Sequence, residues 1–326
     1  MNLLPLERAA RPAPRHDAAA GALRLVAGVE RVVHGRRAAV ELVVCAVLAG
    51  GHVLVEDVPG SGKTTLARAV ARSLGGTFRR VQCTSDLLPA DITGSGVWDP
   101  GRRQLTYVPG PLFAHVVLVD ELNRAPARTQ SAFLEAMDEG AVTVDGVRHP
   151  LPDPFVLLAT QNPLEQYGTY PLPEGQLDRF AVSLSLGANS PQTERRVVRE
   201  QLQRATVDDL DAVTTPADLA ALRAESRRTH VGDAVLDHAL RLVEATRDCP
   251  AVALGASTRA GLVLVRCAQA RALLAGRDHV LPDDVKAVAA PVLGHRLVLA
   301  DGSSTPEQGR RVVAGLLAGL PVPLHA

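Results

Sequence analysis

The amino-acid sequence predicts an α/β fold, in which helices flank a parallel sheet, followed by a smaller unit made only of helices. Two observations predict this organisation. Between residues 23 and 189, short runs rich in β-branched residues alternate with segments of helical periodicity, the pattern of consecutive strand–helix–strand units. From about Ser190 the β runs stop, and helical patterns continue to residue 326. A chain of 326 residues is long enough for two modest domains.

Five apolar runs are the candidate strands of the sheet. Three of them are almost continuously apolar, as expected for strands that are covered on both faces. The runs are HVLVE at 52–56, TFRRVQC at 77–83, HVVLVD at 115–120, PFVLLAT at 154–160 and FAVSLSL at 180–186.

Two segments that interrupt this alternation predict hairpins, at 94–108 and 141–151. The second contains Asp145-Gly146 between alternating residues, which is a strong signal for a tight turn. In the helical unit, Thr215-Pro216 and Thr305-Pro306 each place a capping residue before a proline at the first helical position.

Composition predicts a cytoplasmic protein without a membrane-inserted segment. In residues 1–22, Pro, Arg and Asp stand where a secretion signal needs an unbroken apolar run, so no such signal is predicted. We expect these residues to form a mobile tail instead. The longest apolar run, at 42–55, is shorter than the ~20 residues needed to cross a bilayer. The four cysteines fit no zinc pattern and are typical of a reducing compartment.

Charge and aromatic content argue against a nucleic-acid partner. The chain has 35 basic and 35 acidic residues, so it has no global field that would attract a polyanion. Aromatic residues make up 3% of the chain, which leaves few platforms for stacked bases.

The stretch VEDVPGSGKTTLARAV at 55–70 predicts a phosphate-binding loop between a strand and a helix. Glycines let backbone N–H groups close on phosphate oxygens, Lys63 supplies a charge for the β and γ phosphates, and the Thr64 hydroxyl is placed to ligate Mg²⁺. Asp57 stands where the generic pattern has its first glycine, at a position that need not approach the phosphates. The predicted nucleotide-binding residues of the loop are Pro59, Gly60, Ser61, Gly62, Lys63, Thr64 and Thr65.

Polar residues at the ends of two other strands predict the rest of a hydrolytic site. Asp120 and Glu121 end the run HVVLVDE, and we expect Asp120 to hold Mg²⁺ through its water shell while Glu121 polarises the attacking water. Asn162 follows the run at 154–160, and its amide can both donate and accept between the γ-phosphate and that water.

Two arginines are candidates for binding phosphate. Arg259 lies in the first turn of a helix that Ser257 is expected to cap, where a cation opposes the helix dipole unless an anion is nearby. Arg179 follows Asp178 and is a candidate for stabilising charge in the transition state.

Together these motifs resemble the MoxR family of AAA+ ATPases. The stretches that carry the resemblance are VEDVPGSGKTTLARAVA, RRVQCTSDLLPADITGS, GPLFAHVVLVDELNRAPARTQSAFLEAMDEG, VTVDGVRHPLPDPFVLLATQNPLEQYGTYPLPEGQLDRF and GASTRA, and they extend from about Leu23 to Leu317. The resemblance implies an AAA+ nucleotide-binding domain at 23–189 with two hairpin insertions and a helical lid at 190–326, with ATP and Mg²⁺ as cofactors.

The resemblance also assigns family roles to the predicted residues. The loop with Lys63 matches Walker A, the acids at 120 and 121 match Walker B, and Asn162 matches sensor 1. Arg179 matches the arginine finger, with Arg124 and Arg128 as alternatives, and Arg259 matches sensor 2. The stretch VVHG at 32–35 resembles the segment that borders the adenine.

In the family the finger reaches the nucleotide of a neighbouring subunit, so the resemblance implies a ring, usually a hexamer. It also implies a chaperone-like remodeller of partner proteins, often partners with a von Willebrand A-type metal-binding domain. Two other hypotheses stay open: a nucleotide-gated scaffold that barely hydrolyses ATP, and a motor on nucleic acid that uses Arg102, Arg103 and Arg148 near the hairpins.

Overall fold

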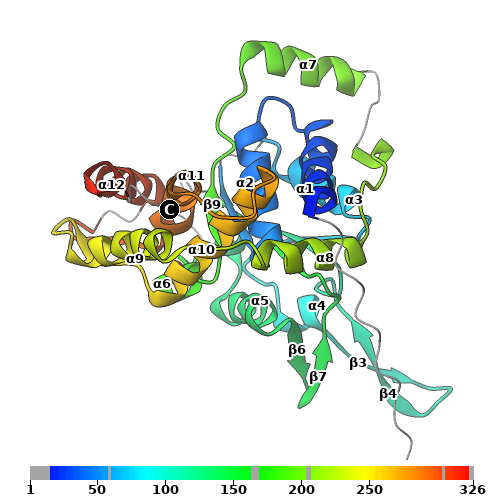
Figure 1. Ribbon diagram of the computed structural model, residues 1–326. Helices are drawn as coiled ribbons and strands as arrows, with labels where there is room; N and C mark the ends of the chain where they lie inside the picture. The colour runs from blue at the N-terminus through cyan, green and yellow to red at the C-terminus, as the bar shows by residue number, and fades with distance from the viewer. Residues whose placement is uncertain (1–14, 58–59, 163–168, 203–206, 303–304, 323–326) are drawn as a thin grey trace, which may run out of the picture.

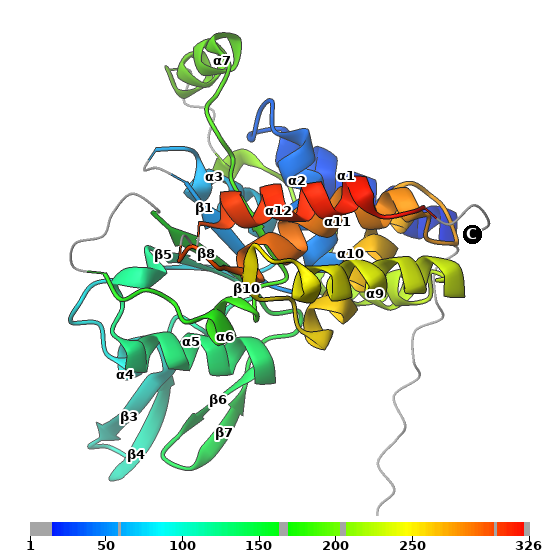
Figure 2. The same cartoon turned by 90° about the vertical axis from the view of Figure 1, so that its left-hand side faces the viewer.

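The computed structural model describes residues 15–57, 60–162, 169–202, 207–302 and 305–322. A parallel sheet lies at the centre, helices cover both of its faces, two hairpins project from one end, and further helices lie beside the sheet (Figures 1 and 2). These features confirm the predicted fold class.

All five apolar runs form strands of one parallel sheet. The strands are β1 (Val53–Glu56), β2 (Phe78–Gln82), β5 (Val116–Asp120), β8 (Val156–Gln161) and β9 (Val182–Leu184), in the order β2-β5-β8-β1-β9. Because neighbouring strands are parallel, their carboxyl ends meet at one edge of the sheet. The residues that follow β1, β5 and β8 are therefore brought together.

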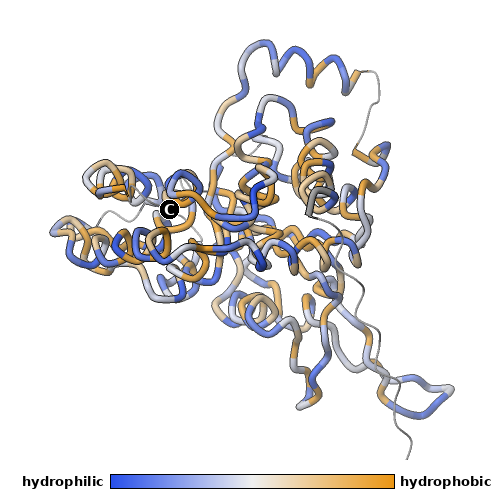
Figure 3. The backbone as a smooth tube through the Cα atoms, in the orientation of Figure 1, coloured by the Kyte–Doolittle hydropathy of each residue, from blue (hydrophilic) through white to orange (hydrophobic). Residues whose placement is uncertain are grey.

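Alternate residues of the central strands face two separate hydrophobic cores. Val53 and Val55 belong to a core formed with the helices on one face, whereas Leu54 belongs to the core on the other face. The first face is covered by α1 (Arg15–Glu30), α2 (Arg37–Leu48) and α3 (Lys63–Ser73), and the second by α4 (Pro89–Thr93) and α5 (Ala127–Glu139). Figure 3 shows many hydrophobic residues along the central strands and the helices packed beside them.

Both predicted hairpins are present and project away from the sheet (Figure 1). The first pairs β3 (Gly94–Asp99) with β4 (Gln104–Pro109), and the second pairs β6 (Ala141–Val144) with β7 (Val147–Pro150). Asp145 and Gly146 both have positive φ, as the predicted tight turn requires. The rings of Tyr107 and His149 stack at 3.9 Å and so link the two hairpins.

The C-terminal part is mainly helical, with capped helix starts at Thr215, Ser257 and Thr305 as predicted. One feature corrects the prediction of helices alone: Val252–Leu254 (β10) and Val298–Leu299 (β11) form a short antiparallel pair. The larger helices are α7 (Pro191–Leu202), α8 (Pro216–Arg227), α9 (Asp233–Asp248), α10 (Thr258–Leu274), α11 (Pro282–Leu293) and α12 (Pro306–Gly319). Short turns of helix are α6 (Glu174–Leu177), η1 (Leu122–Arg124), η2 (Val207–Asp209) and η3 (Gly294–Arg296).

The predicted tail of residues 1–22 is wrong for its last part. Helix α1 begins at Arg15, and Ala18, Ala19 and Ala22 are buried in the core. The reason is physical: a run of alanines has high helix propensity, and its small side chains let α1 approach its neighbours closely. Residues 1–14 lie outside the described residues. No helix in the described part of the chain is long and apolar enough to cross a membrane.

Candidate nucleotide-binding site

The predicted phosphate loop lies between the end of β1 and the start of α3. Gly60 and Gly62 have φ of 84° and 96°, a conformation that favours glycine, and Gly62 caps the helix that begins at Lys63. A Cβ built on either glycine meets no atom within 4 Å, so their backbone borders open space. An anion can therefore approach the loop and the positive end of α3 directly. Pro59 lies outside the described residues.

Asp57 anchors the base of this loop. Its carboxylate accepts hydrogen bonds from the backbone N–H of Leu186 and from Ser185 Oγ, both just beyond β9. Its carbonyl oxygen accepts a hydrogen bond from Lys63 Nζ at 2.7 Å. The side chain thus points toward β9 and away from the glycines, which explains why an aspartate is accommodated where the generic motif has glycine.

Asp120 and Glu121 lie at the same sheet edge but hold different partners. Asp120 Oδ2 accepts from Arg80 Nε at 2.6 Å, and its Oδ1 lies 3.3 Å from the hydroxyl of Thr160. Glu121 Oε2 accepts from Gln82 Nε2 at 3.1 Å and lies 3.1 Å from Arg124 Nε.

The two carboxylates point in different directions because the backbone changes conformation between them. Asp120 ends a strand, whereas Glu121 has φ 57° and ψ 51°, a left-handed conformation that is uncommon outside glycine. Such conformations are costly and concentrate at functional sites. Successive residues of a strand already point to opposite faces, and this local turn adds to the divergence.

Oxygen donors of the predicted type for Mg²⁺ are present at this edge. Asp120 is a buried carboxylate and Thr64 carries a hydroxyl at the first turn of α3; both are hard donors. Mg²⁺ beside a nucleotide is commonly held by one or two protein groups together with phosphate oxygens and water. The donor set therefore fits Mg²⁺, although no group of three or more metal-binding side chains occurs among the described residues.

Asn162 directly follows β8, the strand between β1 and β5. The register pairs Glu56 with Gln161 and Val119 with Ala159, so Asn162 lies at the same edge as the loop and the acids. The structure thus brings the loop, both acids and Asn162 to one end of the sheet, as predicted.

Arg179 and Arg259 lie at the other end of the sheet. Arg179 Nη1 is 2.9 Å from Asp138 Oδ2, and Arg259 Nη2 is 2.6 Å from Asp138 Oδ1. Asp138 is near the end of α5, next to Met137, whose carbonyl contacts His52 just before β1. The four residues of β1, on the order of 13 Å of chain, therefore separate these arginines from the loop.

The arginines border a small cavity of about 140 Å³ that is also lined by Arg266 and by the glycines that precede β1. His52, beside them, is buried, and burial lowers its pKa to about 4. Its Nδ1 accepts from the N–H of Leu157, so its Nε2 carries the proton and donates to Met137. The histidine is therefore neutral, and the guanidinium groups supply the positive charge of this surface.

Three partners of the acids were missed by reasoning from sequence: Arg80, Gln82 and Thr160. The structure shows that β2 pairs with β5 and places Gln82 opposite Asp120, a strand order that the sequence analysis did not predict. Arg80 and Gln82 are two apart on one strand and share a face. Arg124, an alternative finger, instead contacts Glu121 of its own chain.

Comparisons with known proteins agree with this geometry. Residues 52–182 match the model of the ATPase family associated with various cellular activities (AAA), and residues 244–315 match the model of an AAA lid domain. The chain is 42% identical to uncharacterized protein YeaC of Bacillus subtilis, with 93% of this chain and 95% of YeaC covered. It is 40% identical to chaperone MoxR1 of Mycobacterium tuberculosis, with 89% and 79% covered. A solved structure of a candidate ATPase from Cytophaga hutchinsonii superposes with a TM-score of 0.86 at 33% identity, covering 95% of this chain and 97% of that one.

Proposed function

The chain belongs to the MoxR family of AAA ATPases, and from that premise we propose that it hydrolyses ATP with Mg²⁺ in order to remodel partner proteins. The observation that carries the proposal is the set of groups at one sheet edge: an open glycine loop with Lys63, the acids at 120 and 121, and Asn162. Each group has a distinct task in phosphoryl transfer.

Binding begins at the loop. The triphosphate lies against the backbone N–H groups of residues 60–65, and Lys63 leaves the carbonyl of Asp57 to reach the β and γ phosphates. Thr64 and Asp120 would hold Mg²⁺, which would supply positive charge against the phosphates. Thr65 and Ser61 complete the rim of the loop.

Hydrolysis depends on Glu121 and Asn162. Glu121 accepts the proton of the attacking water, and Asn162 orients this water toward the γ-phosphate. In the structure Glu121 instead contacts Gln82 and Arg124, so it must exchange these partners for water before it can act. The same contacts favour a nucleotide-gated scaffold with little turnover as the second candidate.

The position of Arg179 and Arg259 supports a site shared between copies. These arginines are separated from the loop of their own chain by the length of β1. Both are partly exposed, and both pair with the carboxylate of Asp138. In a head-to-tail ring, one copy presents its arginine edge to the loop edge of the next. We infer that both arginines act in trans in a ring, with the hexamer as the expected closure.

The proposed client is a protein, with the von Willebrand A-type metal-binding domain as the class to test first. The relative from Mycobacterium tuberculosis is named a chaperone, which supports this reading. The proposed domain limits are 23–189 for the nucleotide-binding domain and 190–326 for the lid. However, α8 contacts α1 and α2 as well as α10, so it also packs on helices of the nucleotide-binding domain. A cytoplasmic setting is proposed because four cysteines are free.

The test compares Glu121→Gln with Lys63→Ala and with Glu139→Gln, which changes an exposed glutamate at the end of α5. Binding of an ATP analogue and phosphate release are measured separately. Glu121→Gln is expected to keep binding and lose about 100-fold or more in turnover, Lys63→Ala to lose binding, and Glu139→Gln to match the wild type. Binding without phosphate release by the wild type would favour the scaffold, and no binding at all would reject both candidates.

A second experiment tests the client. The Glu121→Gln variant, held with ATP, is incubated with a purified von Willebrand A-type domain with its metal bound and with the same domain after metal removal. Complex formation that requires ATP and the intact domain is expected; equal binding with and without nucleotide would contradict remodelling of this class.

A further inference from the structure

The carboxylate of Glu56, the last residue of β1, is buried beneath the start of the phosphate loop. Ser183 Oγ donates to its Oε2 at 2.5 Å, whereas its Oε1 is buried and has no hydrogen-bond partner among the described residues. Burial raises the pKa of Glu56, and the contacts with Ser183 and Arg310 oppose that rise. A buried carboxylate with one unsatisfied oxygen is costly unless a cation completes it.

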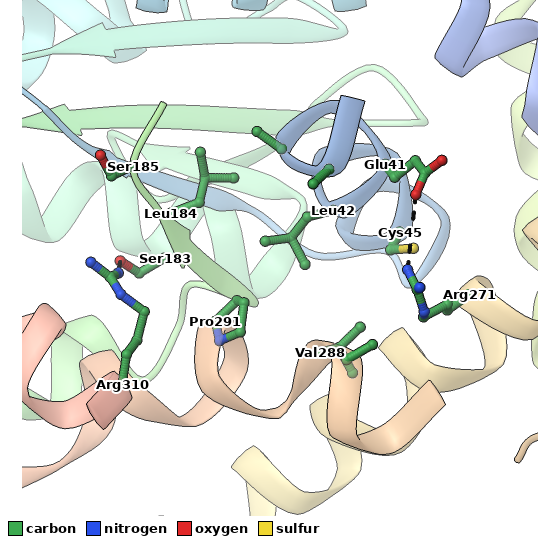
Figure 4. A pocket seen from close by; sticks show the side chains of 13 residues that line it. Glu41, Leu42, Cys45, Ser183, Leu184, Ser185, Arg271, Val288, Pro291 and Arg310 are labelled. Carbon is green, nitrogen blue, oxygen red and sulfur yellow. Dashed lines mark hydrogen bonds and ion pairs between the residues drawn. The ribbon is translucent and has the colours of Figure 1, made fainter. Parts of the chain in front are cut away.

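Arg310 of α12 is the cation that faces this carboxylate. Its Nη1 lies 3.7 Å from Glu56 Oε2 and 3.4 Å from Ser183 Oγ, within ion-pair range but beyond a well-formed hydrogen bond. Figure 4 shows the guanidinium beside Ser183, at the wall of a pocket of about 460 Å³ between α2, β9 and α11. The side chain borders open space on one side, so a small shift of α12 would complete or break the pair.

Helix α12 packs tightly against η3, so Arg310 is expected to move together with both elements. A Cβ on Gly309 would lie 2.0 Å from the carbonyl oxygen of Gly294, which means that the backbones of α12 and η3 are in direct contact. Arg296, the last residue of η3, is buried and pairs with Asp178 at 2.8 Å. The unit of η3 and α12 therefore contacts two places: Glu56, which with Asp57 forms the stem of the phosphate loop, and the segment that carries Arg179.

The loop side of the contact is linked to Lys63. Asp57 follows Glu56, and its carbonyl holds the Lys63 ammonium while its carboxylate holds the residues beyond β9. A phosphate that draws Lys63 away releases one of these restraints on the 56–57 stem. The position of Glu56, and with it the attraction for Arg310, would then change with occupancy of the loop.

We propose that the Glu56–Arg310 pair couples the phosphate loop to the unit of η3 and α12, which makes Arg310 a positioning residue for nucleotide binding. This inference rests on the proposed function, since it requires that the loop bind nucleotide. Linkage is reciprocal: if nucleotide shifts α12 through Arg310, then loss of Arg310 alters nucleotide affinity by the same coupling free energy.

The test uses the full chain and four variants: Arg310→Met, Arg310→Lys, Glu56→Gln and the double variant Glu56→Gln/Arg310→Met. Arg311→Met is the matched control, because Arg311 is the next residue on α12, is exposed and pairs with Glu307 on its own helix. Affinity for a fluorescent ATP analogue, thermal stability, and hydrogen exchange of residues 306–319 with and without nucleotide are measured.

Nucleotide is expected to change amide exchange in α12 of the wild type and of Arg311→Met. Arg310→Met is expected to bind the analogue about five- to tenfold more weakly and to lose the exchange response of α12, while Arg310→Lys retains most of both. The double variant should be no weaker than Arg310→Met alone, because the pair is already broken.

Two results would overturn the coupling. One is a wild type that binds nucleotide with no change in α12 exchange, and the other is losses in Glu56→Gln and Arg310→Met that simply add. If Arg310 has a purely structural role, Arg310→Met should be less stable to heat but should show the same nucleotide-dependent change in α12 amide exchange as the wild type. This outcome also counts against the coupling. A wild type that binds no nucleotide would instead reject the proposed function, and the coupling with it.

Discussion

Arg179 and Arg259 bind the two oxygens of a single carboxylate, Asp138, at 2.9 and 2.6 Å. They come from segments 80 residues apart in the sequence, one just before β9 and one at the start of α10. One negative charge between two positive ones leaves a net cation, which is a suitable surface for an anion presented by another molecule. Asp138 therefore orients both guanidinium groups without neutralising the pair.

Replacing Asp138 should show whether this residue serves to orient Arg179 and Arg259 or to stabilise the fold. In Asp138→Asn the two arginines lose their shared anion and repel each other, but both are partly exposed, so we expect a loss of less than about 1 kcal/mol in the free energy of unfolding. The loss of turnover, expressed as a free energy, should exceed this loss of stability, because the arginines no longer hold their positions. Urea unfolding and phosphate release measure the two effects; unchanged turnover would show that Asp138 has only a structural role.

Mixing two inactive variants tests whether the arginines act across a subunit boundary. Lys63→Ala removes the loop cation, and Arg179→Ala removes the finger, so each variant alone should be inactive. When the two variants are mixed in equal amounts and assemble into mixed rings, about a quarter of the interfaces join an intact loop to an intact arginine. About a quarter of wild-type turnover should therefore return. Arg259→Ala should complement Lys63→Ala in the same way. Failure of both mixtures to recover activity would contradict the trans arrangement.

These arginines also show where reasoning from sequence ends. Strands, hairpins and helix caps were predictable because alternation, Asp145-Gly146 and Thr-Pro pairs act over a few residues. The convergence of the loop, the acids and Asn162 followed from parallel topology. The approach of Arg259 to Asp138 did not, because it depends on how the helical part packs beside the sheet, which no local pattern specifies.

Arg80 should compete with Mg²⁺ for Asp120. Its Nε lies 2.6 Å from Oδ2 of this buried carboxylate. In Arg80→Met the competing cation is gone, so binding of a fluorescent ATP analogue should reach half saturation at a Mg²⁺ concentration about three- to tenfold lower. Arg79→Met, an exposed neighbour on the opposite face of β2, is the control and should leave the Mg²⁺ dependence as in the wild type. A rise in the required Mg²⁺ would mean that Arg80 supports the site.

Stability should decrease on acidification because of buried neutral histidines. Burial lowers the pKa of His52 from 6.5 to about 4 and that of His295 well below 6.5. Between about pH 6.5 and 4 the unfolded chain binds protons that the folded chain does not, so stability falls as pH falls through this window.

For His52 the loss at pH 5.5 relative to pH 7.5 is about 1 kcal/mol. His52→Gln, which can still accept from Leu157 and donate to Met137, should flatten this part of the dependence in urea unfolding. A variant with the full wild-type slope would exclude His52 as its source.

Two glycines of α12 should respond to alanine in opposite directions. A Cβ on Gly315 would meet no neighbouring atom within 4 Å, so Gly315→Ala only adds helix propensity and should stabilise by up to about 1 kcal/mol. Gly309→Ala gains the same propensity, but its Cβ would lie 2.0 Å from the Gly294 carbonyl, and α12 must move off η3 at a cost of about 1–3 kcal/mol. Because Arg310 follows Gly309, that movement should also weaken nucleotide binding, which Gly315→Ala should leave unchanged. Equal unfolding midpoints for the two variants would show that the contact between α12 and η3 is loose and could not transmit a shift from Glu56.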